Sequence, residues 1–178
     1  METFHINRMV AVTSNPRRCH FSNAPSLITV NRTYGNGTAQ EWLTYMVSDI
    51  SEFSGARNKI TPGQINQIVQ LITVEYGYLN MAEIMLFCRR FKSGYYGSFY
   101  SSVDPMTIMA GLKQFIRERA DAWNVRYSEQ AAKRLEEELH NPDNMSYDEW
   151  QIIKQMQSEY EMFVPGICNP FSNKQETL

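Results

Sequence analysis

The fold is decided by residues 80–119, which read NMAEIMLFCRRFKSGYYGSFYSSVDPMTIMAGLKQFIRER. Two segments of this stretch carry apolar residues at the three- and four-residue spacing of one helical face. Each begins with a residue that can cap a helix: Asn80, with Glu83 three positions on, and Asp104, with Pro105 after it. Residues 92–103 join the segments and are rich in glycine and aromatic residues. The pattern predicts two amphipathic helices connected by an aromatic loop.

The same signals predict helices on both sides of this pair. One should run over residues 38–53 with Thr38 as its cap, and another should start at the capping box Thr61-Pro62-Gly63-Gln64. The helix after Asp104 either continues beyond Tyr127 or breaks at Ser128 and resumes through Leu135 and Leu139. A final helix should follow the capping box of Ser146 and Glu149, with these residues at core spacing: Trp150, Ile153, Met156, Tyr160 and Phe163.

These helices predict an all-α protein, a compact irregular bundle of five or six helices spanning residues 38–164. Residues 1–37 have weak periodicity and many breakers, so we expect an irregular N-terminal arm, docked through Leu27, Ile28 and Val30. The segment 27–30 is also the one plausible short strand. Residues 165–178 are polar and contain proline, which predicts a short flexible tail.

Composition places the chain among ordinary globular proteins. It has 178 residues, a hydrophobic fraction of 43% and a net charge of −2. The three cysteines are far apart and odd in number, and no signal peptide is recognisable, which favours a reducing compartment such as the cytoplasm. No apolar run reaches the roughly 20 residues that span a bilayer, so no membrane insertion is expected.

Motifs for catalysis and metal binding are missing from the sequence. It has no P-loop, no Gly-x-Ser-x-Gly and no His-Glu-x-x-His, and Cys19 and His20 lack a second ligand pair at zinc-finger spacing. Glu75 and Glu83 sit among apolar residues, where a structural ion pair with Arg89, Arg90 or Arg117 is expected more often than an active site. We therefore predict no enzyme activity, no catalytic residue, no metal site and no cofactor.

Basic and aromatic residues gather around the loop and form the candidate binding cluster. Between residues 89 and 119 there are six basic residues against Asp104 and Glu118. Three interpretations remain open: core packing under the loop, which is favoured, a surface for single-stranded nucleic acid, and a protein-binding surface. The candidate contact residues are Arg89, Arg90, Lys92, Tyr95, Tyr96, Tyr100, Arg117 and Arg119.

Several segments also carry a family resemblance. They include Asp49-Ile50-Ser51-Glu52-Phe53-Ser54-Gly55, Glu83-Ile84-Met85-Leu86-Phe87 and Arg90-Phe91-Lys92, followed by Gly94, Tyr96, Gly97, Phe99, Tyr100 and Asp104-Pro105. Over roughly residues 25–125 the chain resembles an uncharacterised family, a domain of unknown function, of gut anaerobes and their phages and mobile elements. The family's usual loop is Gly-Arg-Tyr-Gly-Arg-Phe-Tyr-Gly. This chain has Tyr95, Ser98 and Ser101 where Arg, Arg and Gly are usual, which removes two cations and weakens the nucleic-acid interpretation.

The resemblance implies no established activity, so no catalytic residue is transferred from it. The occurrence of the resembled family in phages and mobile elements implies a non-enzymatic accessory or adaptor protein of such an element, acting in DNA replication or another nucleic-acid transaction. A helicase-loader-like adaptor would contact a protein partner and also single-stranded DNA. The alternatives are an inhibitor of a host defence or host enzyme that acts by protein binding, and a virion structural or cargo protein. The oligomeric state is left open.

Overall fold

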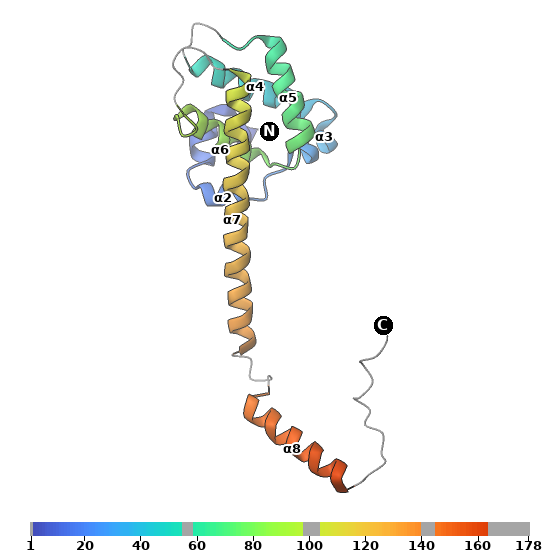
Figure 1. Cartoon of the computed structure of the whole chain (residues 1–178). Coiled ribbons are helices and arrows are strands. Elements are labelled where there is room, and N and C mark those ends of the chain that lie inside the picture. The colour runs from blue at the N-terminus through green and yellow to red at the C-terminus, as the bar shows by residue number, and fades with distance from the viewer. Residues whose placement is uncertain (1, 55–58, 98–103, 140–144, 164–178) are drawn as a thin grey trace. The chain divides into compact units, whose positions relative to one another are not determined.

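The computed structural model describes residues 2–54, 59–97, 104–139 and 145–163 (Figure 1). In these ranges the chain forms eight α-helices, two short 3-10 helices and no strand. The structure divides into two units, residues 1–127 and 128–178. The all-α prediction is confirmed. The expected number of five or six helices is too low, because the segment before residue 38 is also helical.

The N-terminal segment contains the elements that the sequence patterns missed. It begins with the 3-10 helices η1 (Glu2–Phe4) and η2 (Ile6–Arg8), followed by α1 (Met9–Val12), α2 (Pro16–His20) and α3 (Leu27–Tyr34). Local caps start two of these helices. The side chain of Asn15 accepts a hydrogen bond from the Arg18 backbone N–H at the start of α2, and Ser26 does the same for Thr29 at the start of α3.

The segment expected as a short strand is the first turn of α3. Leu27 and Val30 are buried, one helical turn apart, whereas Ile28 is largely exposed. The chain pairs in an extended manner just before this helix, where Ser26 forms an isolated antiparallel bridge with Asn80. The Leu27 N–H donates to the Leu79 carbonyl at 3.0 Å. These bonds fix the start of α3 against the connection that leads into α6.

The next three helices have the expected bounds: α4 (Thr38–Phe53), α5 (Pro62–Tyr76) and α6 (Met81–Lys92). The predicted capping boxes of α5 and α6 are both formed. Thr38 is not the cap of α4. Its place is taken by Gly37, whose φ of 99° favours glycine, and the Ala39 N–H donates to the Asn31 side chain instead.

Helix α6 lies at the centre of the first unit. Nine of its twelve residues are buried, and it contacts α1, α2 and α4. Helix α7 (Pro105–Leu139) covers it through Ile108, Leu112 and Phe115, all fully buried. The rings of Phe87 and Phe115 lie 5.9 Å apart between centroids. The predicted packing of the two helices that flank the aromatic loop is therefore present.

The second unit contains the end of α7 and all of α8 (Tyr147–Phe163). Helix α7 continues through Ser128 without a break, which decides between the two alternatives left open by the sequence. The expected capping box of α8 is formed: the Glu149 N–H donates to the Ser146 hydroxyl at 3.2 Å, and the Ser146 N–H donates to the Glu149 carboxylate at 2.8 Å.

Candidate functional site

Three cations of the candidate cluster are engaged in ion pairs inside the first unit. Arg90 lies 2.8 Å from the Glu118 carboxylate, and Lys92 lies 2.5 Å from the carboxylate of Asp49. Arg119 donates from its Nε to the buried Glu83 at 2.7 Å. A phosphate group would have to compete with these carboxylates for each cation. The pairs make the core-packing interpretation stronger for Arg90, Lys92 and Arg119.

The loop tyrosines differ in their surroundings. Tyr96 packs against the core, with its ring centroid 5.7 Å from that of Phe87, and burial raises the pKa of Tyr96 to about 12. Tyr95 is 57% exposed, and the Arg90 guanidinium lies 5.1 Å from its ring centroid. Tyr100 lies outside the described residues. Of the two loop tyrosines that the structure describes, Tyr95 therefore remains available to a partner.

Arg89 and Arg117 are the remaining cations of the candidate cluster. Arg89 is half-buried and Arg117 is exposed, and neither has a carboxylate partner in the part of the chain that the structure describes. Arg89 lies on α6 and Arg117 lies on α7. Together with Tyr95, these two arginines are what the structure leaves of the predicted contact surface.

Glu83 joins three parts of the first unit. It is fully buried, as its apolar surroundings indicated, but its partners differ from the expected Arg89, Arg90 and Arg117. One carboxylate oxygen accepts from Arg119 and lies 3.2 Å from Nδ1 of His20, and the other accepts from the Asn80 backbone N–H at 3.0 Å. Each oxygen therefore has a partner, and the arrangement is that of a structural ion pair.

The apolar residues of α8 whose side chains the structure describes are exposed, which differs from the core position predicted by their spacing; the side chains of Tyr160 and Phe163 lie outside that description. Trp150 and Ile153 are 47% and 41% exposed, and Tyr147 and Met156 are more exposed still. No residue of α8 whose side chain is described is buried. Periodicity identified one apolar face of the helix, but the covering element is not among the described residues of this unit.

Charge is distributed unequally between the two units. Residues 1–127 contain 13 basic and 9 acidic residues, a net charge of +4, whereas residues 128–178 contain 4 basic and 10 acidic residues, a net charge of −6. The overall value of −2 conceals this difference. A running count of charge along the sequence would have found the acidic excess of residues 128–178.

The described residues contain no group of three or more His, Cys, Asp and Glu side chains that could hold a metal ion. Cys88 is buried, and burial raises the pKa of its thiol to about 12, so this cysteine is neutral and shielded. In the same ranges no helix is long and apolar enough to cross a bilayer.

Comparison with known proteins identifies one family. The model of a family of unknown function, DUF6633, matches residues 59–159, which is more than half of the chain. The match takes in α5, α6, α7 and most of α8. The expectation of an uncharacterised family is confirmed. No curated protein and no solved structure matches.

Proposed function

The chain belongs to the DUF6633 family, whose function is unknown, and from its surfaces we propose that it is a non-enzymatic adaptor that docks on a partner protein through α8. The docking face is formed by Tyr147, Trp150, Ile153 and Met156. The observation that carries the proposal is that these apolar side chains are all exposed on one helix.

Helix α8 needs a covering surface to be stable. Helices of this length are marginal in water on their own, and most of their stability in proteins comes from packing an apolar face. Contiguous exposed apolar residues usually mark interaction sites. Trp and Tyr are also the residues that most often dominate binding energy at interfaces. A groove on a partner protein would supply the missing contacts by the familiar helix-in-groove mode.

The net charge of the second unit indicates which residues should line the partner's groove. The unit that carries α8 has a net charge of −6, so two copies of it would repel each other on approach. A partner groove with an apolar floor and a border of Lys and Arg complements both the apolar face and the acidic residues beside it. Asp148 and Glu149 in the first turn of α8 are the nearest candidates for contact with such a border.

Single-stranded nucleic acid is a second candidate partner, for the first unit. The observation that favours it is the net charge of +4 on residues 1–127, together with the exposed Tyr95 and with Arg89 and Arg117, which have no carboxylate partner among the described residues. Exposed aromatic rings and cations are the usual elements of single-strand binding. An adaptor whose two units carry opposite charge could hold a protein at one unit and DNA at the other.

The biological setting follows from the resemblance described above. We place the adaptor in a phage or mobile element, in DNA replication or a related transaction. An inhibitor of a host defence or host enzyme would use the same face of α8, and so would a virion cargo protein. The identity of the partner separates these three possibilities.

The test compares two variants that each add one negative charge to α8. Ile153→Asp places the charge in the apolar face, and Gln155→Asp places it about 200° around the helix, at an exposed polar position. Proteins captured by the wild-type chain from extract of the source cell would be identified, purified and titrated against the full-length wild type and both variants by calorimetry.

We expect one purified protein to bind the wild type and Gln155→Asp alike, and to bind Ile153→Asp at least about tenfold more weakly. Equal affinity for all three chains would refute docking through this face. Sedimentation of the chain alone tests whether a second copy of the chain covers this face instead. A dimer that Ile153→Asp dissociates would show that it does. That result would overturn the partner-protein proposal.

A further inference from the structure

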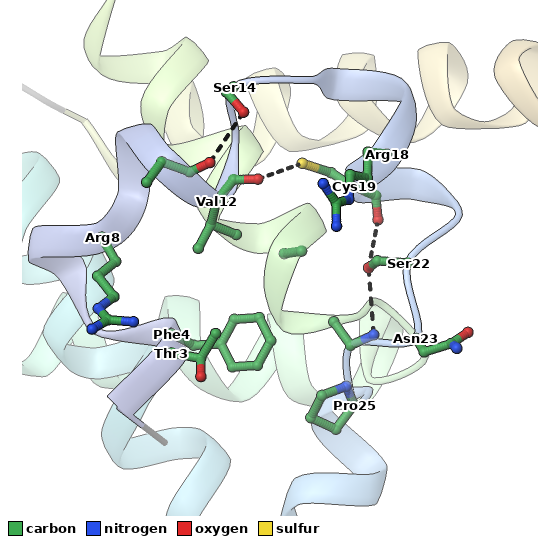
Figure 2. A pocket seen from close by; sticks show the side chains of 13 residues that line it. Thr3, Phe4, Arg8, Val12, Ser14, Arg18, Cys19, Ser22, Asn23 and Pro25 are labelled. Carbon is green, nitrogen blue, oxygen red and sulfur yellow. Dashed lines mark hydrogen bonds between the residues drawn. The ribbon is translucent and has the colours of Figure 1, made fainter.

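A pocket of about 510 Å³ opens in the N-terminal part of the first unit (Figure 2). It is formed mainly by the segment from η1 to the residues just before α3, together with one residue of α6. The lining residues that matter for its chemistry are Phe4, Arg8, Val12, Arg18, Cys19 and Pro25. Pockets that bind small molecules typically have volumes of about 300–1,000 Å³.

The walls of the pocket are mostly apolar. Phe4, Val12, Ala24 and Pro25 supply hydrocarbon surface, and Figure 2 shows the side chains of Phe4, Val12 and Pro25 around the same space. The thiol of Cys19 belongs to the wall and donates to the Val12 carbonyl at 3.5 Å. Burial raises the pKa of Cys19, so the neutral thiol adds a further weakly polar surface.

The charged groups of the pocket are all positive. Arg8 and Arg18 line it, and no acidic residue does. Neither guanidinium has a carboxylate partner in the described part of the chain. Figure 2 shows the guanidinium of Arg18 directed toward the space that the apolar residues surround. Arginine recognises carboxylate and phosphate groups through several N–H donors in a fixed planar arrangement.

We propose that this pocket binds a small organic anion, a compact apolar body carrying one carboxylate or phosphate group that Arg18 holds, while Arg8, on the opposite side of the pocket in Figure 2, adds positive charge. The apolar body lies against Phe4, Val12 and Pro25. The site is separate from α8 and does not depend on the docking proposed for that helix. All lining residues except Ala82 precede residue 59, so the site also lies outside the segment that the family model matches.

Trp42 provides a reporter for the pocket. Its indole N–H donates to the backbone carbonyl of Phe4 at 2.9 Å, so an anion that settles against Phe4 should shift the indole resonance. The chain has three tryptophans, and Trp150 lies in the other unit, where it serves as an internal control. Spectra of the full-length, nitrogen-15-labelled protein would be recorded during titration with phenyl phosphate, with benzoate and with the neutral benzyl alcohol.

We expect a saturable shift of the Trp42 signal with at least one of the two anions and none with benzyl alcohol. Phenyl phosphate and benzoate distinguish a phosphate ligand from a carboxylate ligand. The double variant Arg8→Gln/Arg18→Gln should bind at least about tenfold more weakly, because a hydrogen bond to a charged group typically contributes about that factor. Arg32→Gln removes an exposed arginine outside the pocket and should leave the titration unchanged.

Three outcomes would overturn the proposal. These are no saturable shift of Trp42 with either anion, an equal shift with benzyl alcohol, and equal anion binding by the double variant. The dispersion of the remaining spectrum shows whether each variant is folded. Loss of docking through α8 would leave these titrations unaffected, so the two proposals fail independently.

Discussion

Replacement of Glu83 by alanine should strongly destabilise the first unit. This carboxylate is fully buried and has three partners, which come from the start of α6, from α2 and from α7. Alanine removes all three acceptor contacts at once. Because the neighbouring groups cannot reach water without local rearrangement, the loss should exceed that of an ordinary surface ion pair.

The magnitude can be worked out contact by contact. Loss of the capping box at Asn80 should cost about 1 kcal/mol. His20 is only 5% exposed, and leaving its ring nitrogen without a partner should cost about 2 kcal/mol. Arg119 is 23% exposed, so water compensates for much of the lost ion pair, and we expect this pair to contribute about 0.5 kcal/mol to the decrease in unfolding free energy. The expected decrease in unfolding free energy is therefore about 3 to 4 kcal/mol, a large part of typical domain stability.

Urea unfolding followed by far-ultraviolet circular dichroism measures this decrease directly. Glu118→Ala is the matched control, since it removes one carboxylate from the more exposed pair with Arg90 and should cost less than about 1 kcal/mol. Glu83→Gln should fall between the two, because its amide oxygen can still accept from Asn80. A loss for Glu83→Ala no larger than that for Glu118→Ala would refute the structural role assigned to this carboxylate.

Three further predictions concern other groups of the first unit. A thiol reagent at about pH 8 should leave Cys88 unmodified in the folded protein and label it after unfolding, since burial raises its pKa to about 12; rapid labelling of folded protein, mapped by peptide mass spectrometry, would contradict this. Burial raises the pKa of Tyr96 from 10.0 to about 12, so its contribution to the unfolding free energy is fully present below pH 10 and is lost as pH rises toward 12. Tyr96→Phe should therefore show a smaller decrease in unfolding free energy over this interval. An unchanged dependence of the unfolding free energy on pH would argue against burial of Tyr96. If the first unit binds single-stranded DNA, affinity should fall with salt, and Arg89→Ala/Arg117→Ala should reduce the logarithmic salt slope by about one to two; absence of binding at low salt, measured by fluorescence anisotropy, would exclude the second candidate function.

The later helices could be predicted because their signals are local. The capping box of Thr61 and Gln64 and the apolar stripe of the following residues need no information from the rest of the chain. Helices α1 and α2 have only four and five residues, too few to show a helical period. In α3 the β-branched Ile28, Thr29 and Val30 suggested a strand, but the cap at Ser26 and the burial of Leu27 and Val30 on one face favour a helix.

The candidate site was harder to predict because its pairings connect distant positions. Lys92 pairs with Asp49, 43 residues away, and Arg119 pairs with Glu83, 36 residues away. A count of charges near the loop shows six cations but gives no information about which carboxylates lie opposite them. The spacing of Trp150, Ile153 and Met156 correctly indicated an apolar helical face. Periodicity does not tell whether the covering surface belongs to the same chain.

The central position of α6 has a practical consequence for work on relatives of this protein. The family match begins at residue 59, yet α6 is covered in part by α1, α2 and α4, which all precede that residue. A fragment cut to the matched boundaries would expose most of the apolar surface of α6 to water and should aggregate when expressed. The matched segment is therefore shorter than the folding unit, and homologues need to be aligned and expressed with enough upstream sequence to complete this core.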